Sequence, residues 1–286
     1  MMQAWLVYNK EDYSKNTCFA NSLIAYAKEK NLAMQVVLRE DITLGIENNV
    51  LTIEYGNQKC RPELVINRSR DAFLARHLEL MDIRVYNSYE ITYLCNHKAL
   101  THQAVSRLGI PSVNSLFCNK DYFKPDEIHL KYPVILKSVS GHGGHEVFKC
   151  DNKEEVITQL IHIKEKEFLL QEICDNPGID VRVFVIGRQI IGAIKRESHV
   201  DFRSNYSLGG NASVYELTEK NIKLVERILD ALKCDFVGID FMMNQAGNFI
   251  FNEIEDVVGS RTLYAHTTID AAKCYIEYIA STLKRY

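Results

Sequence analysis

Apolar and polar positions follow two patterns along the first third of the chain: short β-branched runs, and longer stretches with helical spacing. The short runs predict strands at 4–8, 33–38 and 63–67. The longer stretches predict helices over 17–31 and 71–81, the second with Asp71 near its start. A small hairpin is predicted over 51–59. Strands that alternate with helices are typical of a parallel α/β sheet, so an α/β domain is predicted, ending between residues 85 and 95.

A further helix is predicted over 92–111, where Gly109 and Pro111 close the apolar pattern. From Tyr132 onward strands follow strands, at 132–137, 146–149, 167–173, 180–187 and 189–196. The last two are predicted to form a hairpin around Gly187. Helices are predicted at 153–165, 218–233 and 270–286. Runs of strands with segregated helices are typical of α+β layers.

The glycine-rich stretch SGHGGHEV, residues 140–147, lies between two of these predicted strands. His142 and His145 have a spacing that would pair them as metal ligands on a helix. Three glycines make a helix unfavourable here, because each costs about 1 kcal/mol relative to alanine. The stretch is better interpreted as a loop over a ligand, in which Gly141, Gly143 and Gly144 let backbone N–H groups approach phosphate oxygens.

Acidic residues interrupt two apolar strands in VGIDFMMNQAGNFIFNEIED, residues 237–256. A four-residue turn would place Asp240 opposite Phe251, with Glu253 as its diagonal neighbour and Glu255 on the same face. Three carboxylates in an apolar setting require compensation, and a hard divalent cation such as Mg²⁺ supplies it. The alternative interpretation is a solvent-exposed edge strand whose acids are hydrated.

Basic residues suited to phosphate or carboxylate binding occur near these motifs: Lys98, Lys137, Lys195, Arg196 and Arg203. Arg68 and Arg70 follow a predicted strand of the first domain, where parallel sheets bind ligands, so they are substrate candidates. They are equally suited to neutralise Asp71. Arg261 is a further candidate for gripping a carboxylate, with an ordinary surface ion pair as the alternative.

Composition narrows the function classes. The chain has 286 residues, 47% of them hydrophobic and 25% charged, with net charge −3. These values are ordinary for a globular protein, and the near-neutral charge does not indicate nucleic acid as the main binding partner. No apolar run approaches the ~20 residues of a membrane span, and the first residues lack a secretory pattern. The eight scattered cysteines are therefore expected to be reduced thiols in the cytoplasm.

Taken in order, the motifs resemble the ATP-grasp superfamily, and within it the RimK-like amino-acid and peptide ligases. Lys98 precedes the helix that ends in LGIP, followed by VILKSVSGHGGHEV, LLQEI, DVRVFVIG, IIGAIKR, DFRSN, and then VGIDFM with FNEIE. The resemblance runs from about residue 90 to 262. It implies an N-terminal α/β (pre-ATP-grasp) domain over 1–90 and two α+β lobes that enclose a nucleotide. The lobes would span 91–170, with the phosphate loop, and 171–286, with the metal site.

The resemblance also implies residue roles. Lys98 and Lys137 match the lysines that hold the nucleotide phosphates, and the glycine loop matches a lid over them. The adenine would meet Gln171, Glu172, Ile173 and Cys174, and Asp180 would meet the ribose. Lys195, Arg203 and Asn205 match a signature near the terminal phosphate and the reacting carboxylate. Asp240 and Glu253 match the metal-binding acids.

Two departures from the family pattern stand out. The usual third metal ligand is an asparagine, whereas Glu255 stands at that position. The extra negative charge of Glu255 would strengthen Mg²⁺ binding or be balanced by Arg261. Alternatively, the Glu255 side chain would turn away and leave one coordination position to water. The stretch DVVGSRTLY, residues 256–264, replaces the usual small-residue and proline segment beside the acceptor pocket, so a less common substrate is expected.

The implied function is an ATP-dependent carboxylate–amine ligase. An amino-acid or peptide carboxylate would be joined to an amine through an acyl phosphate, with release of ADP and phosphate. ATP is the implied co-substrate, with two Mg²⁺ or Mn²⁺ ions, and a homo-oligomer is compatible with the family. The alternatives are a glutathione-synthetase-like cofactor or tripeptide ligase, and a nucleotide-binding regulatory protein without ligase activity.

Overall fold

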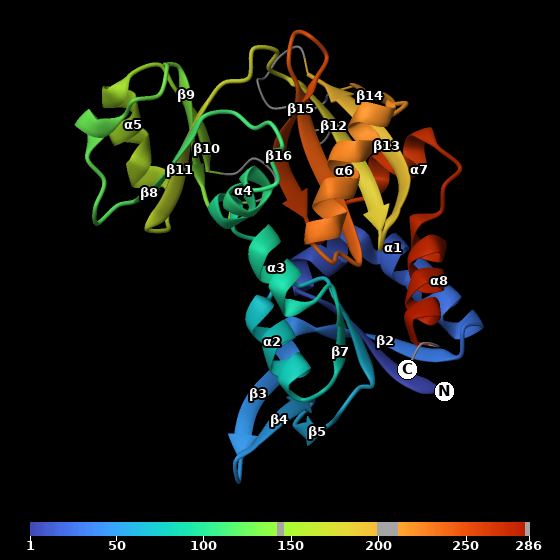
Figure 1. The fold of residues 1–286 in the computed structure, drawn as a ribbon. Coiled ribbons are helices and arrows are strands. Elements are labelled where there is room, and N and C mark those ends of the chain that lie inside the picture. Colours follow the sequence, from blue (N-terminus) through green and yellow to red (C-terminus); the bar gives the residue numbers. More distant parts are fainter. Residues whose placement is uncertain (142–145, 199–210, 284–286) are drawn as a thin grey trace.

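The computed structural model describes residues 1–141, 146–198 and 211–283 (Figure 1). The N-terminal part is built on a four-stranded parallel sheet of order β2–β1–β6–β7. Its strands are β1 (Met2–Tyr8), β2 (Leu32–Leu38), β6 (Leu64–Asn67) and β7 (Arg84–Tyr86). Its helices are α1 (Lys10–Glu29) and α2 (Ala72–Leu80). Asp71 caps α2 by accepting a hydrogen bond from the Leu74 N–H. Parallel strands alternate with helices here, so the predicted α/β segment is confirmed.

A small antiparallel sheet extends from this part, formed by β3 (Ile42–Glu47), β4 (Val50–Tyr55) and β5 (Gln58–Lys59). Both turns have positive φ at their two central residues, 49° and 64° at Asn48-Asn49 and 59° and 60° at Gly56-Asn57. Such turns match the twist of a hairpin, which explains the asparagines and the glycine. The predicted hairpin over 51–59 is confirmed, and β3 is a strand that was not predicted.

The single helix predicted over 92–111 is wrong. The chain forms α3 (Tyr89–Cys95) and α4 (Lys98–Ser106), separated by a break at Asn96-His97. The His97 side chain accepts a hydrogen bond of 3.2 Å from the Leu100 N–H and thereby caps α4. Apolar spacing continues across the break, so periodicity alone does not reveal it. The break makes Lys98 the first residue of α4.

The middle part is an antiparallel sheet of order β10–β9–β11–β8. Its strands are β8 (Ser115–Asn119), β9 (Val134–Ser138), β10 (Val147–Cys150) and β11 (Glu167–Glu172). Helix α5 (Lys153–Gln159) and the short 3-10 turns η2 (Pro125–Glu127) and η3 (Leu160–His162) accompany it. The predicted helix over 153–165 is therefore shorter, and β8 was not predicted.

The C-terminal part is a five-stranded sheet of order β14–β13–β12–β15–β16. Its strands are β12 (Ile179–Ile186), β13 (Gln189–Glu197), β14 (Asn211–Val214), β15 (Phe236–Met243) and β16 (Phe249–Glu255). Helices α6 (Glu219–Ala231) and α7 (Arg261–His266) flank it, and α6 begins with a capping box between Thr218 and Asn221. The α+β layers expected here are confirmed.

Helix α8 (Ala271–Leu283) returns to the N-terminal part and lies beside α1 (Figure 1). One apolar core joins Leu6 of β1, Leu23 of α1, Phe184 of β12 and Ile276 of α8. The first and last parts of the chain are thus packed together around shared side chains. Among the described helices, none has the length and apolar character of a bilayer span.

Candidate functional site

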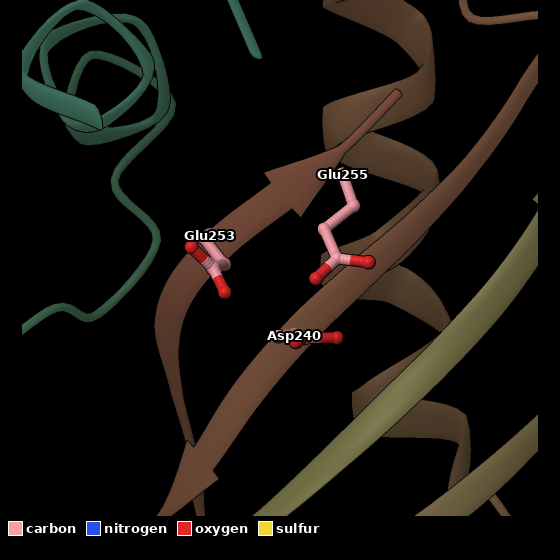
Figure 2. Close-up of side chains that lie close together, drawn as sticks. All are labelled: Asp240, Glu253 and Glu255. Carbon is pink, nitrogen blue, oxygen red and sulfur yellow. The ribbon is translucent and has the colours of Figure 1, made fainter. Parts of the chain in front are cut away.

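Three carboxylates converge on one face of β15 and β16 (Figure 2). Asp240, Glu253 and Glu255 each offer an oxygen, and these oxygens lie within 4.8 Å of one another. The predicted convergence is present, but the predicted register is wrong. Asp240 pairs directly with Glu253, because Phe241 pairs with Phe251 and Asn252 is the extra residue of a bulge. The bulge brings Glu253 closer to Asp240 than a regular hairpin would.

Two arginines from neighbouring strands compensate the buried Asp240. Arg182 on β12 donates from Nε to Oδ1 and from Nη2 to Oδ2, both over 2.7 Å. Arg196 on β13 donates from Nη2 to Oδ2 over 2.8 Å. Burial alone would raise the pKa of Asp240, but the two guanidinium groups outweigh it and hold the pKa at about 2.

Glu255 is bound by Arg182 as well, with 2.7 Å between Nη2 and Oε1. Arg182 is therefore the described ion-pair partner of Glu255, whereas Arg261 was named in one of the three alternatives for this residue. Burial and the neighbouring carboxylates raise the pKa of Glu255 despite this contact. Arg182 was not among the predicted site residues, although a charged residue within the apolar run DVRVFVIG was a usable signal.

The two candidate phosphate lysines lie next to the carboxylates. Lys98 Nζ donates to the carbonyl of Gly141 and lies 3.6 Å from Glu253 Oε2. Lys137 Nζ lies 3.5 Å from Asn252 Oδ1. Burial lowers the pKa of Lys137 to about 8, although the Glu253 carboxylate opposes the shift. An anion bound here would contact two ammonium groups that are partly shielded from solvent, where electrostatic attraction is stronger than in water.

A cavity between the middle sheet and the C-terminal sheet brings most of the predicted nucleotide residues together. Its lining includes the three carboxylates and the predicted residues Lys98, Lys137, Gly141, Gln171, Glu172, Ile173, Cys174 and Asp180. Apolar side chains of Ile135, Val147 and Met242 complete one wall. The cavity thus combines apolar side chains with cations and carboxylates, as a magnesium nucleotide requires. Gly143 and Gly144, like His142 and His145, lie outside the described residues.

The KR…FRSN signature is only partly described. Arg203 and Asn205 lie outside the described residues. Lys195 forms an ion pair of 2.6 Å with Glu197. It is not one of the described residues that line this cavity. Neighbouring strand residues point to opposite faces, so Arg196 rather than Lys195 faces the carboxylates. Arg196 also donates two hydrogen bonds of 2.6 Å to Asp180. The Asp180 carboxylate is therefore already paired with the Arg196 guanidinium.

A second cavity, of about 800 Å³, opens from the carboxylates toward the N-terminal sheet. Arg68, Arg70 and Arg261 all line it, together with Lys98, Gly141, Arg182, Glu253 and Glu255 of the first site. The alternative role of Arg68 and Arg70, neutralising Asp71, does not occur among the described contacts. Arg39 holds Asp71 over 2.6 Å, and Arg70 is paired with Asp12.

Arg68 is buried and held rigidly. Its Nη2 donates to the Val258 carbonyl over 2.9 Å, and its guanidinium carbon lies 5.0 Å from the Phe19 ring centroid. Its Nε is buried and has no hydrogen-bond partner among the described residues. A buried donor without a partner is costly, and this atom is covered by protein atoms.

Comparison with known proteins identifies the family of the chain. A family model described as a RimK-like ATP-grasp domain matches residues 95–279. The uncharacterized protein MG011 of Mycoplasma genitalium is 28% identical over 287 residues, covering 99% of this chain and 94% of that protein. Human beta-citrylglutamate synthase B is 28% identical over 292 residues, covering 96% of this chain and 75% of that protein.

The fold has close counterparts among solved structures. The VanG D-Ala:D-Ser ligase from Enterococcus faecalis matches with a TM-score of 0.78 at 18% identity, covering 97% of this chain and 98% of that one. That likeness shows a shared fold, while the family model covers more than half of this chain. The chain therefore belongs to the RimK-like ATP-grasp family, and the protein is an ATP-dependent ligase that joins a carboxylate to an amine.

Proposed function

We propose that the first cavity binds Mg-ATP and that the second binds the substrates to be ligated. The observation that carries this proposal is the shared lining of the two cavities: Lys98, Gly141, Glu253 and Glu255 border both. A γ-phosphate placed at these residues would be in reach of a substrate in the second cavity. Gln171, Glu172, Ile173 and Cys174 would receive the base, Asp180 the ribose, and Lys137 with Lys98 the phosphates.

The metal-binding residues in this proposal are Asp240, Glu253 and Glu255. Three carboxylate oxygens within 4.8 Å of one another fit the oxygen preference of Mg²⁺ or Mn²⁺, and we propose two ions. The bound cation would neutralise part of the triphosphate charge. The arginines on Asp240 hold that carboxylate in its ionised form and fix its orientation.

The reaction proposed here has two steps. A substrate carboxylate oxygen attacks the γ-phosphorus, so that ADP leaves and an acyl phosphate forms. An amine nitrogen then attacks the acyl carbon, releasing phosphate and a proton and leaving an amide. Lys98 and Lys137 bind the phosphate charge, and Arg203, Lys195 and Asn205 remain proposed participants at the terminal phosphate. Positioning and preorganised charge supply most of the rate enhancement in such transfers.

The second cavity suits an acidic amino acid or peptide. Arg68 and Arg261 both line it, and Arg261 offers its guanidinium from the first residue of α7. Arg70 is a weaker candidate, because Asp12 already neutralises it. The relative named beta-citrylglutamate synthase B points to glutamate as one substrate, which two guanidinium groups would bind through its carboxylates.

Three further proposals concern the whole chain. We keep the division at 1–90, 91–170 and 171–286 as a proposal for its domains. All eight cysteines lie in the described part and carry free thiols, which supports a cytoplasmic location. Assembly of several copies remains a proposal, with light scattering as its test.

Release of ADP and phosphate tests the ligase reaction directly. Purified protein with Mg-ATP is assayed against amino acids and short peptides, singly and in pairs, with Glu253→Gln as the metal-site control. We expect release with particular pairs only, and a loss of at least about 100-fold in the variant. Release of AMP and pyrophosphate would contradict the acyl-phosphate route.

Arg68→Met tests the substrate cavity separately. We expect the KM of the acidic substrate to rise at least about tenfold, because a charge-assisted hydrogen bond is lost, while the KM of ATP stays unchanged. Arg70→Met is the matched control, with a smaller effect expected. Equal changes in both KM values would place Arg68 in a structural role.

A further inference from the structure

The backbone of Lys98 is fixed where the start of α4 meets the end of β9. Its N–H donates to the Val139 carbonyl over 2.8 Å. The Val139 side chain packs with Ala99 of α4 and Leu169 of β11 in a small buried cluster. Because three elements are packed around the lysine backbone, only its side chain is left to be placed by other contacts.

The ammonium group of Lys98 lies between two acceptors. It donates a hydrogen bond to the Gly141 carbonyl, whereas Glu253 Oε2 lies 3.6 Å away, beyond hydrogen-bond distance. Opposite charges this close attract strongly when water is partly excluded. The Gly141 carbonyl therefore restrains the ammonium from closing on the Glu253 carboxylate.

The position of the Gly141 carbonyl depends on a carboxylate outside both cavities. Glycine restricts its own backbone little, so its neighbours must fix it. Ser140 Oγ donates to Glu165 Oε1, and Ser138 Oγ lies 3.5 Å from Glu165 Oε2. Glu165 thus ties down the segment 138–141. Neither Glu165 nor Ser140 is among the described residues that line the two cavities, so their effect on a ligand is indirect.

We infer that Glu165 is a positioning residue for Lys98. By binding Ser140, its carboxylate keeps the Gly141 carbonyl in place, and that carbonyl keeps Lys98 apart from Glu253. The inference rests on the proposed nucleotide site, in which Lys98 binds phosphate and Glu253 binds the cation. Without the Ser140 contact, the ammonium and the Glu253 carboxylate would pair with each other. The nucleotide would then lose affinity through its phosphates alone.

Titration with ADP and with AMP in Mg²⁺ buffer tests the inference, because the two nucleotides differ only in the β-phosphate. Calorimetry on the full-length protein gives the ratio of the AMP Kd to the ADP Kd. We expect this ratio to fall about 5- to 10-fold in Glu165→Met, since a charge-assisted contact to phosphate is weakened. Ser140→Ala should have the same effect. Glu165→Gln keeps an oxygen that accepts from Ser140 and should retain more of the ratio than Glu165→Met.

The ratio separates positioning from a general structural defect, because such a defect would weaken both nucleotides equally. Glu154→Met, at an exposed glutamate of α5, is the matched control and should leave the ratio unchanged. Equal losses of AMP and ADP affinity in Glu165→Met would leave the ratio unchanged and would overturn the inference.

A double-mutant cycle shows whether Glu165 acts through Lys98. Once Lys98→Met has removed the ammonium, adding Glu165→Met should change the ratio by less than about twofold, the usual error of additivity. A further fall of about fivefold in the double variant, or a wild-type ratio near one, would contradict the role assigned to Glu165. Failure of the wild type to bind ADP at all would remove the proposed nucleotide site and this inference with it.

Discussion

Arg182 on β12 holds Asp240 on β15 through two parallel hydrogen bonds of 2.7 Å, and the same guanidinium lies 2.7 Å from Glu255. The cluster that resembles a metal site is therefore partly neutralised by the protein itself. Removal of one partner from a buried pair leaves an uncompensated charge, which is far more costly than the pair is stabilising.

Arg182→Met should consequently lower the free energy of unfolding by about 3–5 kcal/mol. Urea denaturation followed by circular dichroism measures the change. Arg188→Met is the matched control, because Arg188 and Asp230 are 68% and 64% exposed and such a pair contributes less than about 1 kcal/mol. Equal effects of the two substitutions would contradict the importance of burial at Asp240.

Glu255→Asn tests the departure from the family pattern at the third acidic position. The substitution replaces an anionic oxygen donor with a neutral one and releases part of Arg182. We expect the Mg²⁺ concentration for half-maximal activity to rise severalfold, since ligand charge contributes to cation affinity. Turnover at saturating Mg²⁺ should fall by less than about tenfold. An unchanged Mg²⁺ requirement would show that Glu255 is not a metal ligand.

Asp235 should make stability depend on pH. Its burial raises its pKa to about 6, despite a 2.7 Å hydrogen bond from the Tyr278 hydroxyl and the nearby Arg84. Between the unfolded pKa near 4 and the folded pKa near 6, the folded protein binds more protons, so stability falls as pH rises through this window. The contribution is at most about 3 kcal/mol.

Urea unfolding at pH 4.5 and pH 7.5 measures this dependence in the wild type and in Asp235→Asn. The variant keeps an acceptor for Tyr278 but has no ionisable group at this position. We expect the wild type to lose more stability than the variant between the two pH values. Identical pH dependence in both proteins would exclude Asp235 as the titrating group.

Alanine substitutions at Gly187 and Gly247 distinguish the cost of a steric contact from the cost of backbone strain. Both have positive φ, 57° and 74°, but a Cβ at Gly187 would lie 2.5 Å from Tyr278 Cε2, whereas Gly247 has no described atom within 4 Å of the added carbon. Gly247→Ala should cost about 1 kcal/mol, the usual penalty of the left-handed region. Gly187→Ala should cost at least about 1 kcal/mol more, because Tyr278 must move and α8 with it. Thermal unfolding measures both, and equal losses would show that Tyr278 yields freely.

Local patterns in the sequence were sufficient for most elements. Strands β1, β2 and β6 of the first part, most antiparallel strands from Val134 onward and the hairpins around Gly56 and Gly187 were predicted, because side-chain period and turn residues act over a few positions. Strands β7 and β14 were not predicted. The pattern failed where a single side chain decides the outcome. His97 ends one helix and caps the next although apolar spacing runs through, and β8 lacks a clear alternation of apolar and polar residues.

The sequence by itself determined which side chains are available: three acids on two apolar strands, two lysines, and a glycine-rich loop in family order. Tertiary structure decided how they meet. The bulge at Asn252 pairs Asp240 with Glu253, and Arg182 reaches both Asp240 and Glu255 from a strand more than fifty residues away. Register, bulges and ion pairs between distant strands depend on packing across the whole sheet. Such packing leaves no short-range periodicity in the chain, so only the folded protein reveals it.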